Sequence, residues 1–138
     1  MTGTIPLADH EDQGSSLGQI LGFSEVERGP GRLVLEAQAR DDLRNRRGVI
    51  HGGVISALLD CALGGAVVAG IDPEEWCATL QLSVQYIRGA SRGPLRATGR
   101  MTGRGRTCAF AEGEVVDADG RVTSRAQGTW HIWPRRPS

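Results

Sequence analysis

Residues 51–70 read HGGVISALLDCALGGAVVAG, and this stretch decides the fold. Leu, Ala, Val and Ile dominate positions 54–69, no proline interrupts them, and Gly70 followed by Asp72-Pro73 supplies a stop signal. The pattern predicts one helix of roughly 17 residues, about 25 Å long. Apolar residues occupy nearly every side of this helix, so we expect it to be buried in a protein core. Its length and its single acidic residue argue against a membrane span.

Asp60 is the one residue between 54 and 69 whose side chain is charged at neutral pH. A carboxylate in the middle of a buried helix is costly unless it is paired or used in chemistry. The residues on its helix face are mostly small, which lets another group approach it: Gly53, Ser56, Ala57, Gly64 and Val67. A structural aspartate held by neighbouring backbone amides is the alternative interpretation.

The start of the same helix carries bare glycine amides at His51-Gly52-Gly53. Unpaired N–H groups and the positive end of the helix dipole meet there, and glycine lets a ligand oxygen reach the backbone. Gly52 and Asp60 lie about 12 Å apart along the axis, whereas reacting groups must lie within about 3–3.5 Å. We therefore expect a two-fold dimer in which antiparallel helices bring the Asp60 of one subunit beside the Gly52 of the other.

Length and composition predict a single domain without a nucleic-acid partner. The chain has 138 residues, and we expect a flexible N-terminal arm at 1–14, one domain at 15–133 and a C-terminal tail at 134–138. Sixteen basic residues, all arginine, balance sixteen acidic ones, and zero net charge does not favour nucleic-acid binding.

The cysteines and the first residues bear on metal binding and location. Cys61, Cys77 and Cys108 are odd in number and lack CxxC spacing, so we expect reduced thiols and neither a disulfide framework nor a metal site. Residues 1–16 are polar and show no signal peptide. We therefore expect a cytoplasmic protein that does not associate with membranes.

Strand patterns flank the central helix on both sides. We expect a short helix at 15–22, then strands at 23–28, 32–40, 80–86, 95–101, 107–116 and 122–132. Leu80, Leu82, Val84 and Tyr86 alternate with polar residues, which predicts one buried face, and the last four strands are expected to form a meander. The order predicts an α+β hotdog fold, an antiparallel sheet of about five to six strands wrapped around one long central helix.

Three segments carry a resemblance to a known family: Asn45-x2-Gly48-x2-His51-Gly52-Gly53-x6-Asp60, Thr79-x6-Tyr86 and Gly105-Arg106-Thr107. Over roughly residues 17–132 the chain resembles the hotdog-fold acyl-CoA thioesterases. The subgroup it resembles most is the phenylacetate-degradation (PaaI-like) type, which is related to the 4-hydroxybenzoyl-CoA thioesterases. The spacing of the first segment is much more specific than a lone pair of glycines.

The resemblance implies a role for each matching residue. Asp60 matches the general base or nucleophile, and Gly52 matches the amide that polarises the thioester carbonyl. Asn45 and His51 match residues that position substrate or water. Thr79 matches a hydroxyl residue beside the carboxylate. The alternatives are a packing role for His51, a loop-capping role for Asn45 and an ordinary strand position for Thr79.

The resemblance also implies a substrate and an assembly. The substrate would be an acyl-CoA or aroyl-CoA, with coenzyme A as part of the substrate and no separate cofactor. Each site would be built from two subunits of a homodimer, and such dimers often pair into tetramers. The phosphates of CoA call for cations near the site. The candidate CoA contacts are Gly53, Arg88, Arg92, Arg104 and Arg106, although each arginine has a solvated surface role as its alternative.

Two other classes of function stay open at this point. One is a hotdog protein that binds or senses acyl-CoA without catalysis, which would not need the base Asp60. The other is a hotdog hydratase or dehydratase that acts on enoyl thioesters, in which a histidine and a carboxylate are usually placed differently. Release of CoA, binding without release, and a change in enoyl absorbance distinguish the three.

Overall fold

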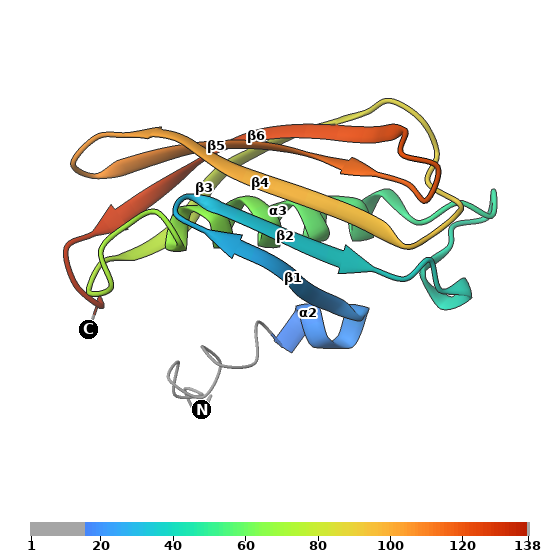
Figure 1. The fold of residues 1–138 in the computed structure, drawn as a ribbon, viewed down its shortest axis with the longest axis horizontal. Coiled ribbons are helices and arrows are strands. Elements are labelled where there is room, and N and C mark those ends of the chain that lie inside the picture. The colour runs from blue at the N-terminus through green and yellow to red at the C-terminus, as the bar shows by residue number, and fades with distance from the viewer. Residues whose placement is uncertain (1–15, 138) are drawn as a thin grey trace.

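One long helix, α3 (Gly52–Val68), lies across one face of a six-stranded antiparallel sheet (Figure 1). The computed structural model describes residues 16–137. The predicted arm at 1–14 lies outside the described residues. The α+β hotdog prediction is confirmed, and the central helix has the predicted position and length.

The strand and short-helix predictions also agree closely with the structure. The remaining elements are α2 (Ser16–Leu21), β1 (Phe23–Gly29), β2 (Arg32–Ala37), η1 (Asp41–Leu43), β3 (Trp76–Tyr86), β4 (Leu95–Arg104), β5 (Cys108–Val116) and β6 (Val122–Trp133). The second strand ends earlier than predicted because residues 38–40 turn away from the sheet, where the Arg40 N–H donates to the Gln38 carbonyl at 2.9 Å. The third strand begins four residues earlier than predicted, at Trp76.

The strand order is β1-β2-β4-β5-β6-β3, and neighbouring strands are antiparallel. The predicted meander is therefore wrong for β3, which lies at the far edge beside β6, while β4 pairs with β2. The composition of the strands accounts for this arrangement. β4 carries the buried residues Leu95, Ala97 and Gly99 under α3, whereas β3 alternates with polar residues that suit an edge with one side in water.

The helix is buried along one stripe only, which corrects the expectation that all its sides are covered. The buried stripe consists of Ile55, Leu58, Leu59, Ala62, Leu63, Ala66 and Val67. On the other side Val68 is 53% exposed, and Asp60 is half-buried. The sheet curls around only part of the helix, so residues 16–137 leave this side partly uncovered.

Small residues let α3 and the sheet approach to backbone contact. A Cβ added at Gly99 of β4 would overlap the carbonyl oxygen of Ala62 and lie 2.6 Å from its carbonyl carbon. A Cβ at Gly113 of β5 would overlap the carbonyl oxygen of Thr98 and lie 2.7 Å from Leu63 Cδ1. These glycines fix how deeply α3 sits in the sheet, and thereby which side of the helix stays open.

A β-bulge in β3 changes which side chains face the helix. The register shifts between Thr79, opposite Trp130, and Gln81, so that Leu80 has no residue opposite it and is 62% exposed. The prediction of one buried face at 80, 82, 84 and 86 is therefore wrong at Leu80. Tyr86 is also 53% exposed. The bulge places Thr79 on the same face of β3 as Leu82.

We predict that Gly99→Ala lowers the free energy of unfolding by about 3 kcal/mol, because the new methyl group meets backbone atoms that cannot move aside. The matched control is Gly103→Ala on the same strand, where a Cβ meets nothing within 4 Å and the change stays within about 0.5 kcal/mol. Urea unfolding at one fixed protein concentration measures both. Equal midpoints for the two variants would contradict the backbone contact.

We predict that Arg104→Gln raises the pKa of Glu75. The Arg104 guanidinium donates to both carboxylate oxygens of Glu75, at 2.7 and 3.0 Å, and the Asp72 amide donates a further bond at 2.9 Å. These contacts hold the pKa of Glu75 at about 2, below its usual 4.5, and the hydrogen bonds from Arg104 have the largest effect.

Because the folded-state pKa lies below the unfolded one, the pair stabilises the fold above about pH 4.5, and this contribution is lost as the pH falls toward 2. Carboxyl NMR titration of Glu75 measures the shift. Arg106→Gln is the control and should leave that titration unchanged. An unaltered Glu75 titration in Arg104→Gln would refute the assignment.

Candidate active site

His51 caps the N-terminus of α3 with its own side chain. The Gly53 N–H donates to His51 Nδ1 at 2.9 Å, and the His51 N–H donates to the Leu43 carbonyl at 2.8 Å. A ring nitrogen that accepts a hydrogen bond carries no proton, so the proton of the neutral imidazole lies on Nε2. The ring is exposed. The Gly53 amide is engaged in this cap, and a contact between Gly53 and substrate stays a prediction.

The Gly52 amide accordingly remains the donor at the tip of the helix. Gly52 is the first helical residue, and no described residue accepts a hydrogen bond from its N–H. The first N–H groups of a helix lack intrahelical acceptors and lie at the positive end of the dipole. The tip of α3 can therefore donate to an anionic oxygen.

Two hydroxyl groups converge on the carbonyl of the same glycine. Tyr86 Oη lies 2.8 Å from the Gly52 carbonyl oxygen, Ser56 Oγ lies 2.9 Å from it, and the two hydroxyls lie 3.0 Å apart. Tyr86 comes from the end of β3 and packs its ring over the first turn of α3. The helix start is therefore held from both its own first turn and the edge strand.

Asp60 lies two turns further along α3 and contacts β3. Thr79 Oγ1 donates to Asp60 Oδ1 at 2.9 Å, across 19 positions of sequence. The bulge in β3 brings the Thr79 side chain to this face of the strand. The structure thus brings Thr79 and Asp60 together, as predicted for a hydroxyl beside the carboxylate. Asp60 and Gly52 of one chain stay about 12 Å apart along the helix.

Asn45 organises the loop that leads into the helix. Its Oδ1 accepts from the Arg47 N–H at 2.9 Å, and its backbone bonds to Val49 and Gly48 at 2.8 and 3.0 Å. Gly48 has a φ of +82°, which favours glycine in this tight turn. The structure gives Asn45 a turn-forming role, and its contact with substrate stays a prediction.

The candidate CoA-binding arginines lie at both ends of α3. Arg88 follows β3, close to the start of the helix, where the Ile50 N–H donates to the Ala90 carbonyl at 2.8 Å. Arg104 lies at the other end, in the ion pair with Glu75, and Arg106 is exposed beside it. Arg92 pairs with Asp119 at 3.4 Å. Arg88 and Arg106 are exposed, whereas the guanidinium of Arg104 is held by Glu75.

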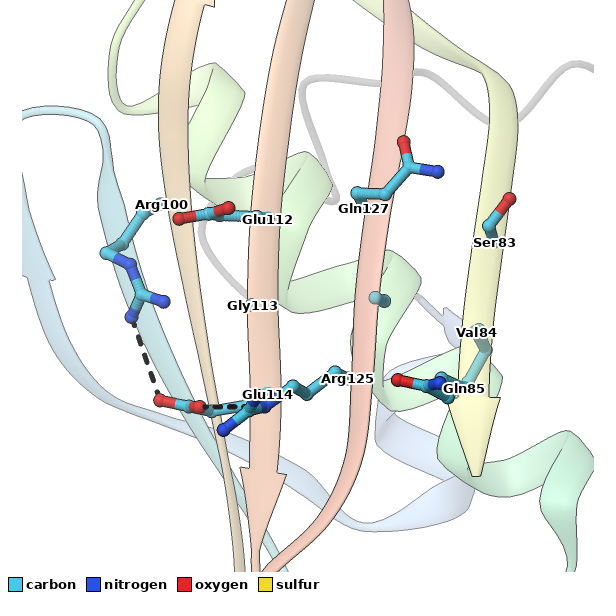
Figure 2. A pocket seen from close by; sticks show the side chains of 10 residues that line it. Ser83, Val84, Gln85, Arg100, Glu112, Gly113, Glu114, Arg125 and Gln127 are labelled. Atoms are coloured by element: carbon cyan, nitrogen blue, oxygen red, sulfur yellow. Dashed lines mark ion pairs between the residues drawn. The ribbon is translucent and has the colours of Figure 1, made fainter. Parts of the chain in front are cut away.

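A cavity of about 490 Å³ lies elsewhere, on the face of the sheet that points away from α3. Figure 2 shows its charged side chains on β4, β5 and β6, with α3 behind the sheet. Glu114 forms weak ion pairs with Arg100 at 4.0 Å and Arg125 at 3.9 Å. This cavity holds none of the predicted site residues. The candidate site is therefore the surface where α3 meets β3, at the Thr79–Asp60 and Tyr86–Gly52 hydrogen bonds.

Other expectations concern metals, thiols and membranes. Within residues 16–137 there is no group of three or more His, Cys, Asp or Glu side chains placed to hold a metal ion. Cys61, Cys77 and Cys108 form no disulfide in the described part of the chain, and burial raises the pKa of Cys77. Among the described helices, none combines the length and the apolar character needed to cross a bilayer.

Sequence reasoning missed the contributions of Ser56 and Tyr86. Ser56 lies four residues after Gly52 and four before Asp60, so all three share one face of α3. A serine in an otherwise apolar helix was the available signal. No local pattern could place Tyr86, because its contact with Gly52 spans 34 positions of sequence.

Comparison with known proteins shows the family and the fold of this chain. A family model of the thioesterase superfamily matches residues 47–124. A protein of Saccharolobus solfataricus, called an esterase by inference only, is 30% identical over 102 residues, which cover 74% of this chain and 72% of the relative.

Two solved structures are similar over most of the chain. A conserved protein of Pseudomonas aeruginosa has a TM-score of 0.84 at 29% identity, covering 89% of this chain and 98% of its own. A variant of the phenylacetic acid degradation protein PaaI from Thermus thermophilus has a TM-score of 0.76 at 25% identity, covering 85% and 98%. The chain therefore belongs to the thioesterase superfamily, and its fold is the hotdog fold of PaaI-like thioesterases.

Proposed function

We propose that this protein hydrolyses an acyl-CoA or aroyl-CoA to the free acid and CoA, at sites shared between two subunits. Membership of the thioesterase superfamily identifies thioester hydrolysis as the general reaction. One observation carries the finer proposal. A helix tip with an available amide and a carboxylate held by a hydroxyl both lie where α3 meets β3.

The Gly52 amide is the proposed oxyanion donor. Attack on a thioester carbonyl creates a tetrahedral intermediate whose oxygen carries negative charge. A preorganised backbone N–H at a helix N-terminus stabilises that charge, and loss of one such donor typically costs about 2.7–4 kcal/mol of barrier. The neighbouring His51 Nε2–H is a second donor in reach of the same tip.

Asp60 is the proposed base or nucleophile. As a base it removes a proton from water while the water oxygen bonds to the carbonyl carbon. The C–S bond then breaks, and the proton passes to the CoA thiolate. As a nucleophile it forms an acyl anhydride with loss of CoA, which water then hydrolyses. Thr79 orients the Asp60 carboxylate in both routes. Both routes need only protein groups and water, without a cofactor.

A two-fold dimer would unite the two halves of the site. Gly52 and Asp60 of one chain are too far apart for one thioester, and antiparallel α3 helices would remove this distance. The open side supports such contact, because three large apolar side chains are exposed along α3 and β3: Val68 at 53%, Leu80 at 62% and Ile87 at 46%. Within residues 16–137, the outer edge of β3 has no neighbouring strand. Pairing of dimers into tetramers and a cytoplasmic location stay predictions.

Exposed arginines near the two ends of α3 are the proposed contacts of the CoA phosphates. Arg88 lies on the same side as the helix tip, and Arg106 lies at the far end of α3, which an antiparallel partner would bring near that tip. Arg104 is a weaker candidate because binding phosphate would compete with Glu75.

We predict that Asp60→Asn lowers kcat for CoA release by about 10²- to 10⁴-fold, because the amide can neither accept the proton nor attack the carbonyl. A panel of acyl- and aroyl-CoAs with a chromogenic thiol reagent measures the reaction. Asp72→Asn, in the exposed connector after α3, is the matched control and keeps wild-type turnover. Undiminished turnover in Asp60→Asn would remove the aspartate from the mechanism. Binding without CoA release in the wild type would refute hydrolysis.

We predict that two inactive variants restore each other in a mixed dimer. Gly52→Pro removes the amide at the first helical position, where proline is tolerated, and the extended His51 (ψ 136°) suits a following proline. Paired with an Asp60→Asn subunit, it leaves one intact site and one doubly defective site, so the purified heterodimer regains about half of the wild-type turnover. Gly52→Ala, which keeps the amide, is the control. A heterodimer as inactive as both parents would place each site within one chain.

A further inference from the structure

The Gly52 carbonyl is the centre of a hydrogen-bond cluster that the reaction as written does not use. Tyr86 Oη and Ser56 Oγ both lie within 2.9 Å of it and 3.0 Å from one another. Each hydroxyl has one proton. Either both donate to the carbonyl, or one donates to the carbonyl and the other donates to its neighbour. In each of these arrangements at least one hydroxyl proton reaches Gly52 O, in addition to the helical Ser56 N–H.

The peptide group carries this polarisation to the next residue. The Gly52 carbonyl and the Gly53 N–H belong to one amide, so donors to the oxygen make that N–H a stronger donor. The Gly53 N–H donates to His51 Nδ1 at 2.9 Å. A chain of hydrogen bonds therefore runs from the hydroxyl pair, through one peptide, to the imidazole. It ends at Nε2–H, on the exposed ring.

We propose that Tyr86 and Ser56 are positioning residues which act through the Gly52–Gly53 peptide to hold His51 as its Nε2–H tautomer, poised to donate to the thioester oxygen. The donation to substrate rests on the proposed function, whereas the control of the tautomer is a property of the free protein. Exposure supports this role, because Tyr86 is 53% exposed and contributes little to the core. The Tyr86 hydroxyl is not needed for packing, yet it is held in place by Gly52 and Ser56.

The two hydroxyls can replace each other, which gives the proposal a distinctive signature. Tyr86→Phe leaves Ser56 to donate to Gly52 O, and Ser56→Ala leaves Tyr86 to do so. We expect each single variant to keep kcat within about twofold, and the double variant to lose about five- to tenfold with KM within twofold. In a His51→Ala background the same double change should leave the residual kcat unaltered. Ser83→Ala, on the outer face of β3, is the control.

Nitrogen NMR of the His51 ring tests the tautomer without any substrate. The wild type should show a protonated Nε2 and an unprotonated Nδ1 at neutral pH. The double variant should show mixed tautomers, and each single variant a smaller shift in the same direction. Unchanged His51 ring signals in the double variant, or an equal loss of kcat in the His51→Ala background, would overturn the proposal. If the wild-type protein released no CoA, only the proposed function would be refuted. The His51 ring signals would still test whether Tyr86 and Ser56 control the tautomer.

Discussion

The backbone contact between α3 and the central strands is the constraint on which the rest of the molecule depends. At Gly99 the helix lies so close that a single methyl group would collide with its backbone at Ala62, and at Gly113 a methyl group would meet the Leu63 side chain of the helix. This contact fixes the rotation of the helix about its axis, with its seven buried residues facing the sheet. The opposite face of the helix, which carries Ser56 and Asp60, must then point away from the central strands. The packing of the helix therefore decides where the candidate catalytic residues lie.

Local sequence pattern was sufficient to predict the helices and strands and the candidate site residues Gly52 and Asp60 on α3. Within residues 54–69 the apolar run, its stop signal and its lone acid predicted α3 and the candidate role of Asp60. The glycines at 52 and 53 predicted a donor at the helix start. These inferences depend on neighbours within two or three turns of one helix, which the sequence displays directly.

Pairings across the sheet could not be obtained in this way. The position of β3 beside β6, the bulge at Leu80 and the contacts of Thr79 and Tyr86 all depend on segments distant in sequence. Strict alternation suggested one buried face in residues 80–86, but a bulge breaks alternation without leaving a mark in composition. The expectation of a fully covered helix failed for a related reason. Sequence records how apolar a surface is, not which molecule covers it.

The pairing of β3 with β6 has a consequence for the order in which the candidate site forms during folding. Trp76 lies opposite Trp133, so the first residue of β3 finds its hydrogen-bonding neighbour only at the final strand. Such high contact order makes the edge strand slow to form, and during synthesis it must wait until nearly the whole domain has left the ribosome. Thr79 and Tyr86 lie on this strand. The strand that contributes these two residues to the candidate site is therefore assembled last, and a chain shortened at its carboxyl end would lose that strand before it lost the helix.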